Sequence, residues 1–457
     1  MRVRGGPRGG ALFSNVSYPV SFAVPLLVLA LVAAPAAPAP LELTQAEAVR
    51  RALTTALSFR GAALDEQIAA EELRLASRAL TPRVTLPLQW IHNSPQRGSA
   101  AAASPTQPGD HGVQSFIATN AIDEYSALAT ISKPFDLSGK LRAALEKSRA
   151  ALAAAHAGTE VARRTLISTT TQAFHDLELA SDRVRDTAAA LESAHTLEGI
   201  TDLLVKAGEA PEVDLLKARL QSSSRTDDLA QAEAARTVAA DALRVLVGAP
   251  MALDIKPVEA ALSLPDASAV DRYVATVLDT RPELAQVDAE WRSAAADYRI
   301  AAAARRPDFT FALSGGFDTD ALTERAIGDH AGIQSTVGLS VPIFDAGESR
   351  IRKQQARLAI AKAEIKRGQV RRELTQQFLD ARARAFAAVR RYEALRATDT
   401  DAERNLTIST TRYRSGEGDI LQVTDAMAAL AAHRTALAQA LHDYRVAMAQ
   451  LQQVAGP

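Results

Sequence analysis

The chain has 457 residues, with 52 lysines and arginines, 53 aspartates and glutamates, and no cysteine. A net charge of −1 argues against a nucleic-acid-binding protein, because such proteins usually carry a basic surplus. The absence of cysteine excludes disulfides, thiolate metal sites, thiol catalysis and a lipidated N-terminal cysteine. Only 5% of the residues are aromatic while alanine is abundant, which favours long helices packed through small side chains over an enzyme pocket built from large rings.

The first 39 residues are organised like an export signal. Arg2, Arg4 and Arg8 precede an apolar run at 22–32, and Ala-Pro-Ala triplets at 34–36 and 37–39 offer cleavage sites. The apolar run is shorter than the roughly 20 residues that a membrane-spanning helix needs. We therefore expect residues 1–39 to be a signal peptide, the alternative being a disordered leader rich in proline and alanine.

The remaining sequence is internally repeated. A shift of 208 residues aligns Pro134 with Pro342, Gly139 with Gly347, Gly208 with Gly416, and Gly248 with Gly456. Further upstream the shift becomes 225 and aligns Pro82 with Pro307. The shift changes because the first copy has 17 more residues between Pro82 and Pro134 than the second copy has between Pro307 and Pro342. Such a repeat predicts one structural unit at 40–248, a linker at 249–266 and a second unit at 267–457. Each unit should contain a helix, a β-hairpin, a long helix, a turn and a return helix.

In the short segments between these prolines, apolar and polar residues alternate with a period of two. In the second copy, 309–317 and 333–341 each place apolar residues on one face; in the first copy 84–90 does so, with a partner strand within 114–131. Alternation over about ten residues is what a transmembrane β-strand requires, although a soluble hairpin with one buried face has the same period. The aromatic residues gathered in these runs favour the membrane: Trp90, Phe309, Phe311 and Phe317. Loops are expected at 93–112 and 318–332.

Two proline-free intervals of 69 residues predict very long helices. They run from Gly139 to Gly208 and from Gly347 to Gly416, and each would span about 100 Å. Small and apolar residues recur every three or four positions, which is typical of a coiled-coil seam. One such seam contains Leu374, Phe378, Ala381, Ala385 and Ala388. Shorter helices are expected at 44–80, 211–247, 267–305 and 420–455. Six arginines between 371 and 391 favour a solvated helix face, the alternative being a lumen wall that attracts anionic cargo.

Four strands from one chain leave two open sheet edges. Such edges cannot face lipid, because lipid cannot satisfy their backbone groups, so copies of the chain must associate to close the sheet. Three copies would supply twelve strands, a size with room for an aqueous lumen, and four copies satisfy the same argument. The expected fold class is therefore α+β, with a long coiled-coil helical barrel continuing a transmembrane β-barrel.

Several motifs, in their order and spacing, resemble the outer-membrane efflux protein (TolC-like) family. They are Leu43-Thr44-Gln45-Ala46-Glu47-Ala48, the run 341–347 leading into Arg350, Tyr413-Arg414-Ser415-Gly416, and Asp425-Ala426. The resemblance covers about 43–456. It implies a homotrimer with a twelve-stranded barrel in the outer membrane of a Gram-negative cell and a periplasmic helical extension. It also implies a periplasmic adaptor protein, an inner-membrane transporter and outer-membrane lipid as partners.

The resemblance also assigns positions at both ends of the long helices. It places a periplasmic gate at Asp425, Gln422, Tyr413 and Asp214. It places adaptor-docking hairpin tips at Lys206, Gly208, Glu209, Arg414, Gly416 and Glu417, and a barrel-to-helix junction at Pro134, Gly139, Pro342 and Gly347. The tip glycines are equally compatible with simple helix breaking. Gln422 and Gly418 depart from the family pattern, which often has an acidic and a basic residue there, so we expect a less charged constriction.

The sequence thus predicts a passive exit duct of a tripartite efflux or secretion system, with no enzymatic activity and no cofactor or metal. The scattered histidines lack metal-site spacing, and no nucleophile elbow or phosphate loop is present. Two alternatives remain at this stage. One is a periplasmic structural coiled-coil protein with soluble hairpins; the other is a duct for type I protein secretion rather than small-molecule efflux.

Overall fold

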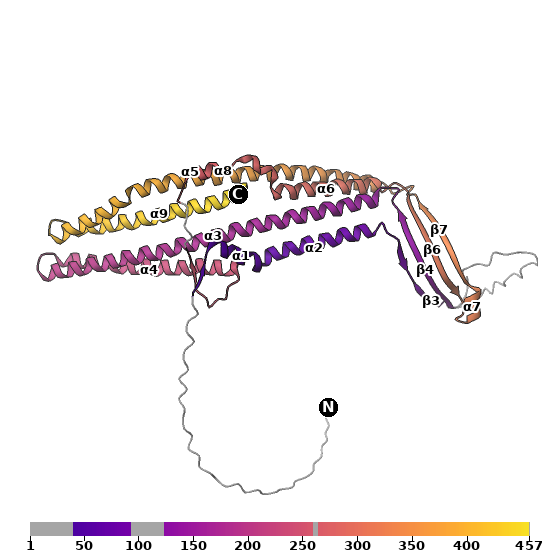
Figure 1. Ribbon diagram of the computed structural model, residues 1–457, viewed down its shortest axis with the longest axis horizontal. Coiled ribbons are helices and arrows are strands. Elements are labelled where there is room, and N and C mark those ends of the chain that lie inside the picture. Colours follow the sequence, from indigo (N-terminus) through magenta and orange to yellow (C-terminus); the bar gives the residue numbers. More distant parts are fainter. Residues whose placement is uncertain (1–39, 93–122, 259–263, 457) are drawn as a thin grey trace, which may run out of the picture. The chain divides into compact units, whose positions relative to one another are not determined.

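The computed structural model describes residues 40–92, 123–258 and 264–456 (Figure 1). The expected signal peptide at 1–39 and the expected first-copy loop at 93–112 lie outside these residues. Between 40 and 457 the helices lie side by side and the larger sheet lies at one end of them (Figure 1).

The two longest helices have the same length and the same boundaries after the 208-residue shift. Helix α3 spans Lys140–Lys206 and α8 spans Glu348–Arg414, each with 67 residues. Their return helices, α4 (Glu212–Val247) and α9 (Ile420–Ala455), have 36 residues each. Both long helices begin after a glycine in the left-handed conformation, Gly139 or Gly347. The expected long helices and their return helices are therefore confirmed.

Two of the other expected helices are interrupted. The segment expected at 44–80 forms α1 (Gln45–Thr55) and α2 (Leu57–Arg78), with Ala56 extended between them. The segment expected at 267–305 forms α5 (Ala267–Asp271), a 3₁₀ turn η1 (Ala275–Thr280) and α6 (Pro282–Ala303). The second interruption has a steric cause, because the residue before a proline avoids the helical region and Arg281, before Pro282, is extended.

A two-stranded parallel sheet attaches the linker to the start of the helical region. Strand β1 (Leu41–Leu43) pairs with β5 (Ile255–Pro257) inside the expected linker. Each strand has three residues, too few to give a periodic signal, and neither was expected from the sequence.

The larger sheet is antiparallel throughout. It contains β2 (Arg83–Thr85), β3 (Leu88–His92), β4 (Asp123–Phe135), β6 (Asp308–Thr319) and β7 (Ala331–Ser340). Strands β2 and β3 both pair with β4 and are two parts of one strand, interrupted at Leu86–Pro87 because proline cannot donate to the ladder. The first-copy partner strand, expected within 114–131, continues to Phe135, and its expected part before residue 123 lies outside the described residues. The expected loop at 318–332 contains a short helix, α7 (Glu324–Asp329).

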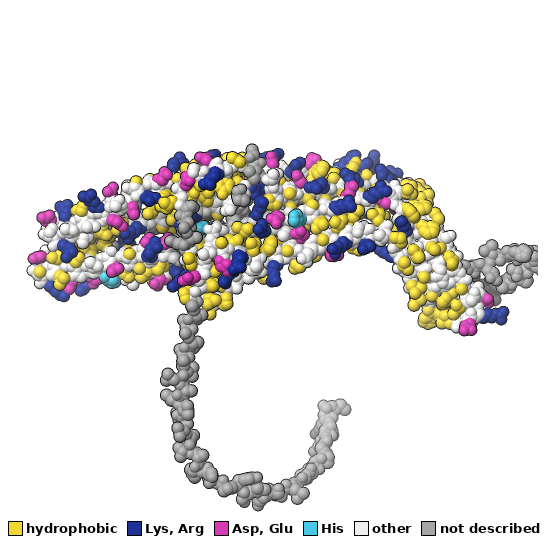
Figure 2. All heavy atoms as spheres, in the orientation of Figure 1, with side chains coloured by type: hydrophobic (Ala, Val, Ile, Leu, Met, Phe, Trp, Pro, Cys, Tyr) yellow, Lys and Arg dark blue, Asp and Glu magenta, His cyan; other side chains and the backbone are white. Residues whose placement is uncertain are grey.

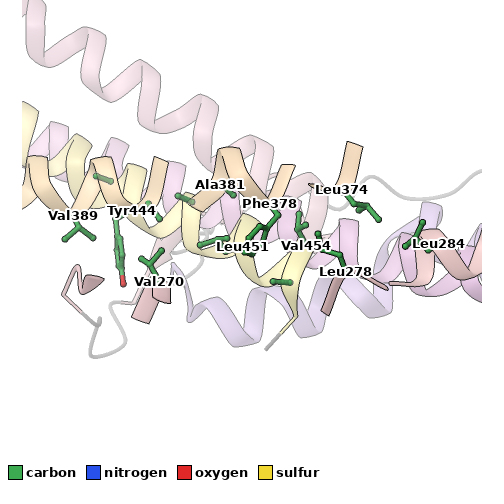
Figure 3. Packing of buried hydrophobic residues seen from close by; sticks show 14 of the residues in the cluster. Val270, Leu278, Leu284, Leu374, Phe378, Ala381, Val389, Tyr444, Leu451 and Val454 are labelled. Atoms are coloured by element: carbon green, nitrogen blue, oxygen red, sulfur yellow. The ribbon is translucent and has the colours of Figure 1, made fainter. Parts of the chain in front are cut away.

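The helices follow a defined lateral order. Near the sheet the contacts run α2, α3, α6, α8, and in the other half they run α4, α3, α9, α8. The expected seam on α8 is confirmed, since Ala381, Ala385 and Ala388 are buried. On α3 the seam expected at Leu177, Ala180, Val184, Ala188 and Leu191 is buried at its first two residues, half-buried at Val184 and Leu191, and exposed at Ala188. Ala143, Ala150 and Ala157 of α3 are buried as well. Where α8 and α9 meet α5, η1 and α6, larger side chains such as Phe378, Leu451 and Tyr444 join the packing (Figure 3). Over the residues that the structure describes, no helix combines the length and apolarity needed to cross a membrane.

Candidate functional site

The two hairpin tips, at 205–211 and 413–419, have the same backbone geometry. Gly208 donates its N–H to Val205 (3.0 Å) and Glu209 to Leu204 (2.9 Å). Gly416 and Glu417 repeat these bonds with Tyr413 (3.1 Å) and Arg412 (2.9 Å). Such paired bonds close a helix through a residue with positive φ, and the φ values of the two glycines are 77° and 74°. Glycine is therefore required here by the turn itself.

The other predicted tip residues are exposed. Lys206 places its Nζ 2.5 Å from a carboxylate oxygen of Asp202, four residues earlier on α3. Glu209, Arg414 and Glu417 extend toward solvent. The tips thus present charges of both signs on a rigid turn, an arrangement suited to a protein partner.

Tyr413 lies inside the molecule, where it links the two hairpins. It is 4% exposed and packs with Leu197 of α3 and with Ile420 and Val423 of α9. Its hydroxyl donates to Oγ1 of Thr201 on α3 at 3.3 Å. Burial raises the pKa of the Tyr413 phenol above its usual value of 10.0.

Asp214 lies close to Tyr413 but does not bond to it. Its carboxylate adds to the raised pKa of Tyr413 through its negative charge, and its Oδ1 lies 3.4 Å from Nζ of Lys217. The structure therefore brings these two predicted gate residues near one another, but Tyr413 bonds to Thr201 and Asp214 bonds to Lys217. Gly418 packs on the same turn, since an added Cβ would lie 3.1 Å from the Tyr413 nitrogen. A basic side chain at position 418 would displace that turn.

Asp425 and Gln422 lie elsewhere, on the exposed face of α9. They are three residues apart, and the neighbouring Val423 and Ala426 point into the packed interior. The same helical stripe continues through Ala428, Ala432, Thr435 and Gln439. These four residues line a groove of about 960 Å³ between α3, α4 and α9. The four predicted gate residues therefore separate into a buried pair and an exposed pair.

The junction between the sheet and the long helices is capped by two aspartates that the sequence analysis missed. Asp136 accepts hydrogen bonds from the N–H groups of Leu141 (3.0 Å) and Arg142 (2.9 Å) at the start of α3. Asp345 accepts from the N–H of Ser349 at 3.1 Å at the start of α8. The bond from the Ser349 side chain is the main cause that lowers the Asp345 pKa below its usual range.

The glycines and prolines predicted at the junction have different places. Gly139 and Gly347 precede the long helices directly, and Pro342 follows the end of β7. Pro134 lies within β4, opposite Thr310. An acidic residue shortly before a glycine and a long helical pattern is a recognisable helix-start signal, which could have found Asp136 and Asp345.

The register gives the large sheet one apolar and one polar face. Residues paired across antiparallel strands share a face. The apolar face carries Val84, Leu88, Trp90, Tyr125, Ala127, Ala129, Ile131, Lys133, Phe135, Phe309, Phe311, Leu313, Phe317, Ile333, Val337 and Leu339. The opposite face carries Thr85, Gln89, Ser126, Thr130, Ser132, Thr310, Ser314, Gln334 and Thr336. Each face has exceptions: His92, Asp123, Thr319 and Ser335 lie on the apolar face, and Ile91, Leu128 and Ala312 lie on the polar face.

The apolar face is open in this chain. Ile333, Val337 and Leu339 are 80%, 64% and 62% exposed. Hydrophobic side chains cover the visible part of the sheet, whereas lysine, arginine and acidic side chains are spread over the helices (Figure 2). A soluble hairpin would bury this face, so the exposure favours a lipid-facing surface.

Aromatic side chains lie at both ends of the apolar face. Trp90 pairs with Tyr125 at the end far from the helices, and Phe135 pairs with Phe309 at the near end. Ten residues of β4 separate Tyr125 from Phe135, a rise of about 33 Å along the strand. With the usual strand tilt this corresponds to a height of about 25 Å, the thickness of the apolar band of an outer-membrane barrel.

A buried polar network joins α3 to α9 in the helical region. Oε2 of Glu178 lies 2.7 Å from Nδ1 of His175 and 3.1 Å from Nη1 of Arg445. Nearby, Nε2 of His442 lies 2.7 Å from a carboxylate oxygen of Asp176. The contacts of Arg445 and His442 connect one structural copy to the other, whereas the His175–Glu178 contact lies within α3. The sequence did not predict the first two because their partners are more than 250 positions apart, and it did not predict the third because its significance depends on burial.

Comparison with known proteins gives a consistent result. A family model described as "Outer membrane efflux protein" matches residues 48–249 and 274–457. Nodulation protein T of Rhizobium leguminosarum bv. viciae is 25% identical over 349 residues, covering 75% of this chain and 71% of that protein.

Solved structures have the same fold. The outer-membrane channel OprN superimposes with a TM-score of 0.76 at 21% identity, covering 90% of this chain and 89% of its own. The outer membrane protein VceC from Vibrio cholerae gives a TM-score of 0.78 at 19% identity, covering 90% and 96%. The expected fold class, long helices continuing a β domain, is thereby confirmed.

Proposed function

Because the chain belongs to the outer membrane efflux protein family, we propose that it is the passive exit duct of a tripartite export system in the outer membrane. The observation that carries this proposal is the large sheet, whose apolar face is exposed and bordered by aromatic residues about one membrane thickness apart. Its other face is polar, as the wall of an aqueous lumen must be. The duct has no enzymatic role, and the energy for transport comes from an inner-membrane transporter.

A homotrimer closes the duct. In the sheet the open edges are β2 and β3 on one side and β7 on the other. In the helices the edges are α2 and α4 on the first side and α8 on the second. In both the sheet and the helices, the two edges of one chain differ, and they come in the same order from one side to the other. One rotation about a central axis therefore places the first edge of each subunit against the second edge of the next subunit, in the sheet and in the helices alike, and closes a ring. Three copies complete a twelve-stranded barrel.

The edge helices carry apolar stripes that this ring would bury. On α2 the exposed residues follow a heptad pattern: Leu57, Leu64, Ile68 and Leu75. On α8 they are spaced by seven: Ile351, Leu358 and Ile365. Leu75 is in the last turn of α2 and Ile351 in the first turn of α8, both next to the sheet. In the ring, α2 of one subunit packs antiparallel to α8 of the next.

The other half of the edge has a matching surface. Exposed apolar side chains on α4 are Val213, Leu216, Leu220, Val238 and Val245. Leu379 and Ile408 are exposed on α8. The same rotation places these surfaces against one another.

The hairpin tips form the periplasmic gate and the docking site for an adaptor protein. Asp425 and Gln422 face the lumen and repeat around the ring, so that Asp425 supplies a ring of carboxylates that attracts cations. Tyr413 and Asp214 hold the tips closed by joining the two hairpins of each subunit. The two structural repeats, 40–248 and 267–457, each contribute one hairpin, and the linker 249–266 joins them.

Cysteine cross-linking tests the ring, and the absence of native cysteine makes the test clean. We expect Leu75→Cys/Ile351→Cys to form disulfide-linked dimers and trimers in isolated outer membranes under mild oxidation. Leu75→Cys/Ile408→Cys is the matched control, because Ile408 lies near the far end of α8 and should not cross-link. Recovery of the protein only from the soluble periplasm would contradict the duct, and cross-linking of both pairs alike would contradict the ring.

A further inference from the structure

Lys133 is the one lysine or arginine among the described residues of the apolar sheet face. It lies on β4 between Ile131 and Phe135 and directly opposite Phe311 of β6. A lysine on a lipid-facing row is costly unless its ammonium group reaches water or an anion. Its long alkyl chain allows this, because the chain can remain in hydrocarbon while the ammonium group reaches the membrane surface.

The side chain of Lys133 is directed toward the helical end of the sheet. Its Nζ lies 5.2 Å from the centre of the Phe135 ring, and Phe135 is the last residue of β4. That ring packs edge-on against Phe309, with 5.4 Å between ring centres. The ammonium group therefore lies over an aromatic pair at the periplasmic border of the apolar band.

No acidic side chain of the described residues pairs with Lys133. Of the nearby acids, Asp136 caps the start of α3 and Asp308 accepts a hydrogen bond from Ser138. Asp308 also lies on the polar face, opposite Ser340. The positive charge of Lys133 is thus left for a ligand from outside the chain.

The surroundings of this border fit a lipid headgroup. The two connections from sheet to helix expose large apolar side chains, with Leu137 70% exposed and Ile343 and Phe344 both 88% exposed. Exposed cations stand just beyond them: Lys140, Arg305 and Arg350. Apolar side chains next to cations are typical of surfaces that lie at a membrane interface.

We propose that Lys133 binds the phosphate of an anionic phospholipid in the periplasmic leaflet. The aromatic pair Phe135–Phe309 contacts the acyl chains near the headgroup, and the ammonium group of Lys133 pairs with the phosphate of that headgroup. The site repeats once per subunit around the outside of the barrel. This inference rests on the proposed insertion of the sheet in the outer membrane.

Electron paramagnetic resonance of spin-labelled lipids tests the site. The purified protein is reconstituted in phosphatidylcholine vesicles that contain spin-labelled phosphatidylglycerol or spin-labelled phosphatidylcholine. We expect the wild-type protein to select phosphatidylglycerol, and Lys133→Gln to lower that selectivity about fivefold at this site, the effect of one lysine at an anionic membrane surface. Lys133→Arg should retain it. Lys362→Gln is the matched control, since Lys362 is an exposed lysine of α8 outside the membrane region.

Two results would overturn the inference: equal selectivity in the Lys133→Gln and Lys362→Gln proteins, or no selectivity in the wild type. Both are distinct from failure of the proposed function, in which the wild-type protein would not insert into the vesicles at all. Size-exclusion chromatography would show whether Lys133→Gln loses the trimer. In that case Lys133→Arg decides: retained selectivity would support binding of the lipid by the positive charge at position 133, and lost selectivity in an intact Lys133→Arg trimer would contradict it.

Discussion

Glu178 should be among the most sensitive positions of the helical region. Its side chain is 5% exposed, and it is the acceptor for both His175, also 5% exposed, and Arg445, 11% exposed. Replacing Glu178 with methionine removes the only carboxylate that contacts the Arg445 guanidinium among the described residues. Breaking one side of a buried ion pair typically costs about 3–5 kcal/mol, because the remaining charge stays buried without compensation. We expect a loss of that size.

The control follows from the same physics. Replacing both partners of a buried ion pair with apolar residues of similar volume is often neutral, so Glu178→Met/Arg445→Met should recover most of the stability that Glu178→Met loses. Guanidinium unfolding in detergent, followed by far-ultraviolet circular dichroism, measures both variants. A loss below about 1 kcal/mol for Glu178→Met, or no recovery in the double variant, would refute the view that this contact holds α3 to α9.

Three further predictions concern the hairpin tips and the proposed gate. Gly416→Ala should destabilise the protein by about 1–2 kcal/mol, because alanine avoids the positive φ of this position. Gly199 lies inside α3 with open space around it, so the control Gly199→Ala should stabilise the protein by about 0.5–1 kcal/mol. Equal effects of the two substitutions in thermal unfolding would contradict this. Asp425→Asn should weaken block of the channel by multivalent cations in planar bilayers, and unchanged block would remove Asp425 from the pore. Burial raises the folded-state pKa of Tyr413 above 10.0, so the contribution of Tyr413 to stability is complete below pH 10 and should be lost as the pH rises through the folded-state pKa. Tyr413→Phe should abolish this loss of stability at alkaline pH. An unaltered pH profile in that variant would exclude Tyr413 as its cause.

The long helices could be predicted because glycine marks their ends. Gly139, Gly208, Gly347 and Gly416 all adopt positive φ, a conformation that other residues avoid, so the helix lengths are encoded at four positions. The break at Ala56 could not be foreseen, since no proline or glycine stands there.

The aromatic border of the sheet was only partly visible in the sequence. Trp90 and Phe309 were recognised, but Tyr125 and Phe135 fall in a strand whose apolar row includes the small residues Ala127 and Ala129. Their significance depends on the register with the neighbouring strands. The contact between Tyr413 and Thr201 likewise joins residues 212 positions apart, and only the packing of the two hairpins brings them together.

Single-channel recording of the purified protein in a planar lipid bilayer tests the central claim most directly. A trimeric duct that crosses the membrane through its closed sheet should give discrete, reproducible conductance steps, with one unit step per inserted trimer. Because Tyr413 and Asp214 are proposed to hold the tips closed, Tyr413→Phe/Asp214→Asn is recorded beside the wild type. A bilayer that remains electrically silent with both proteins, although intact trimers have inserted into it, would contradict the assignment of this chain as an exit duct.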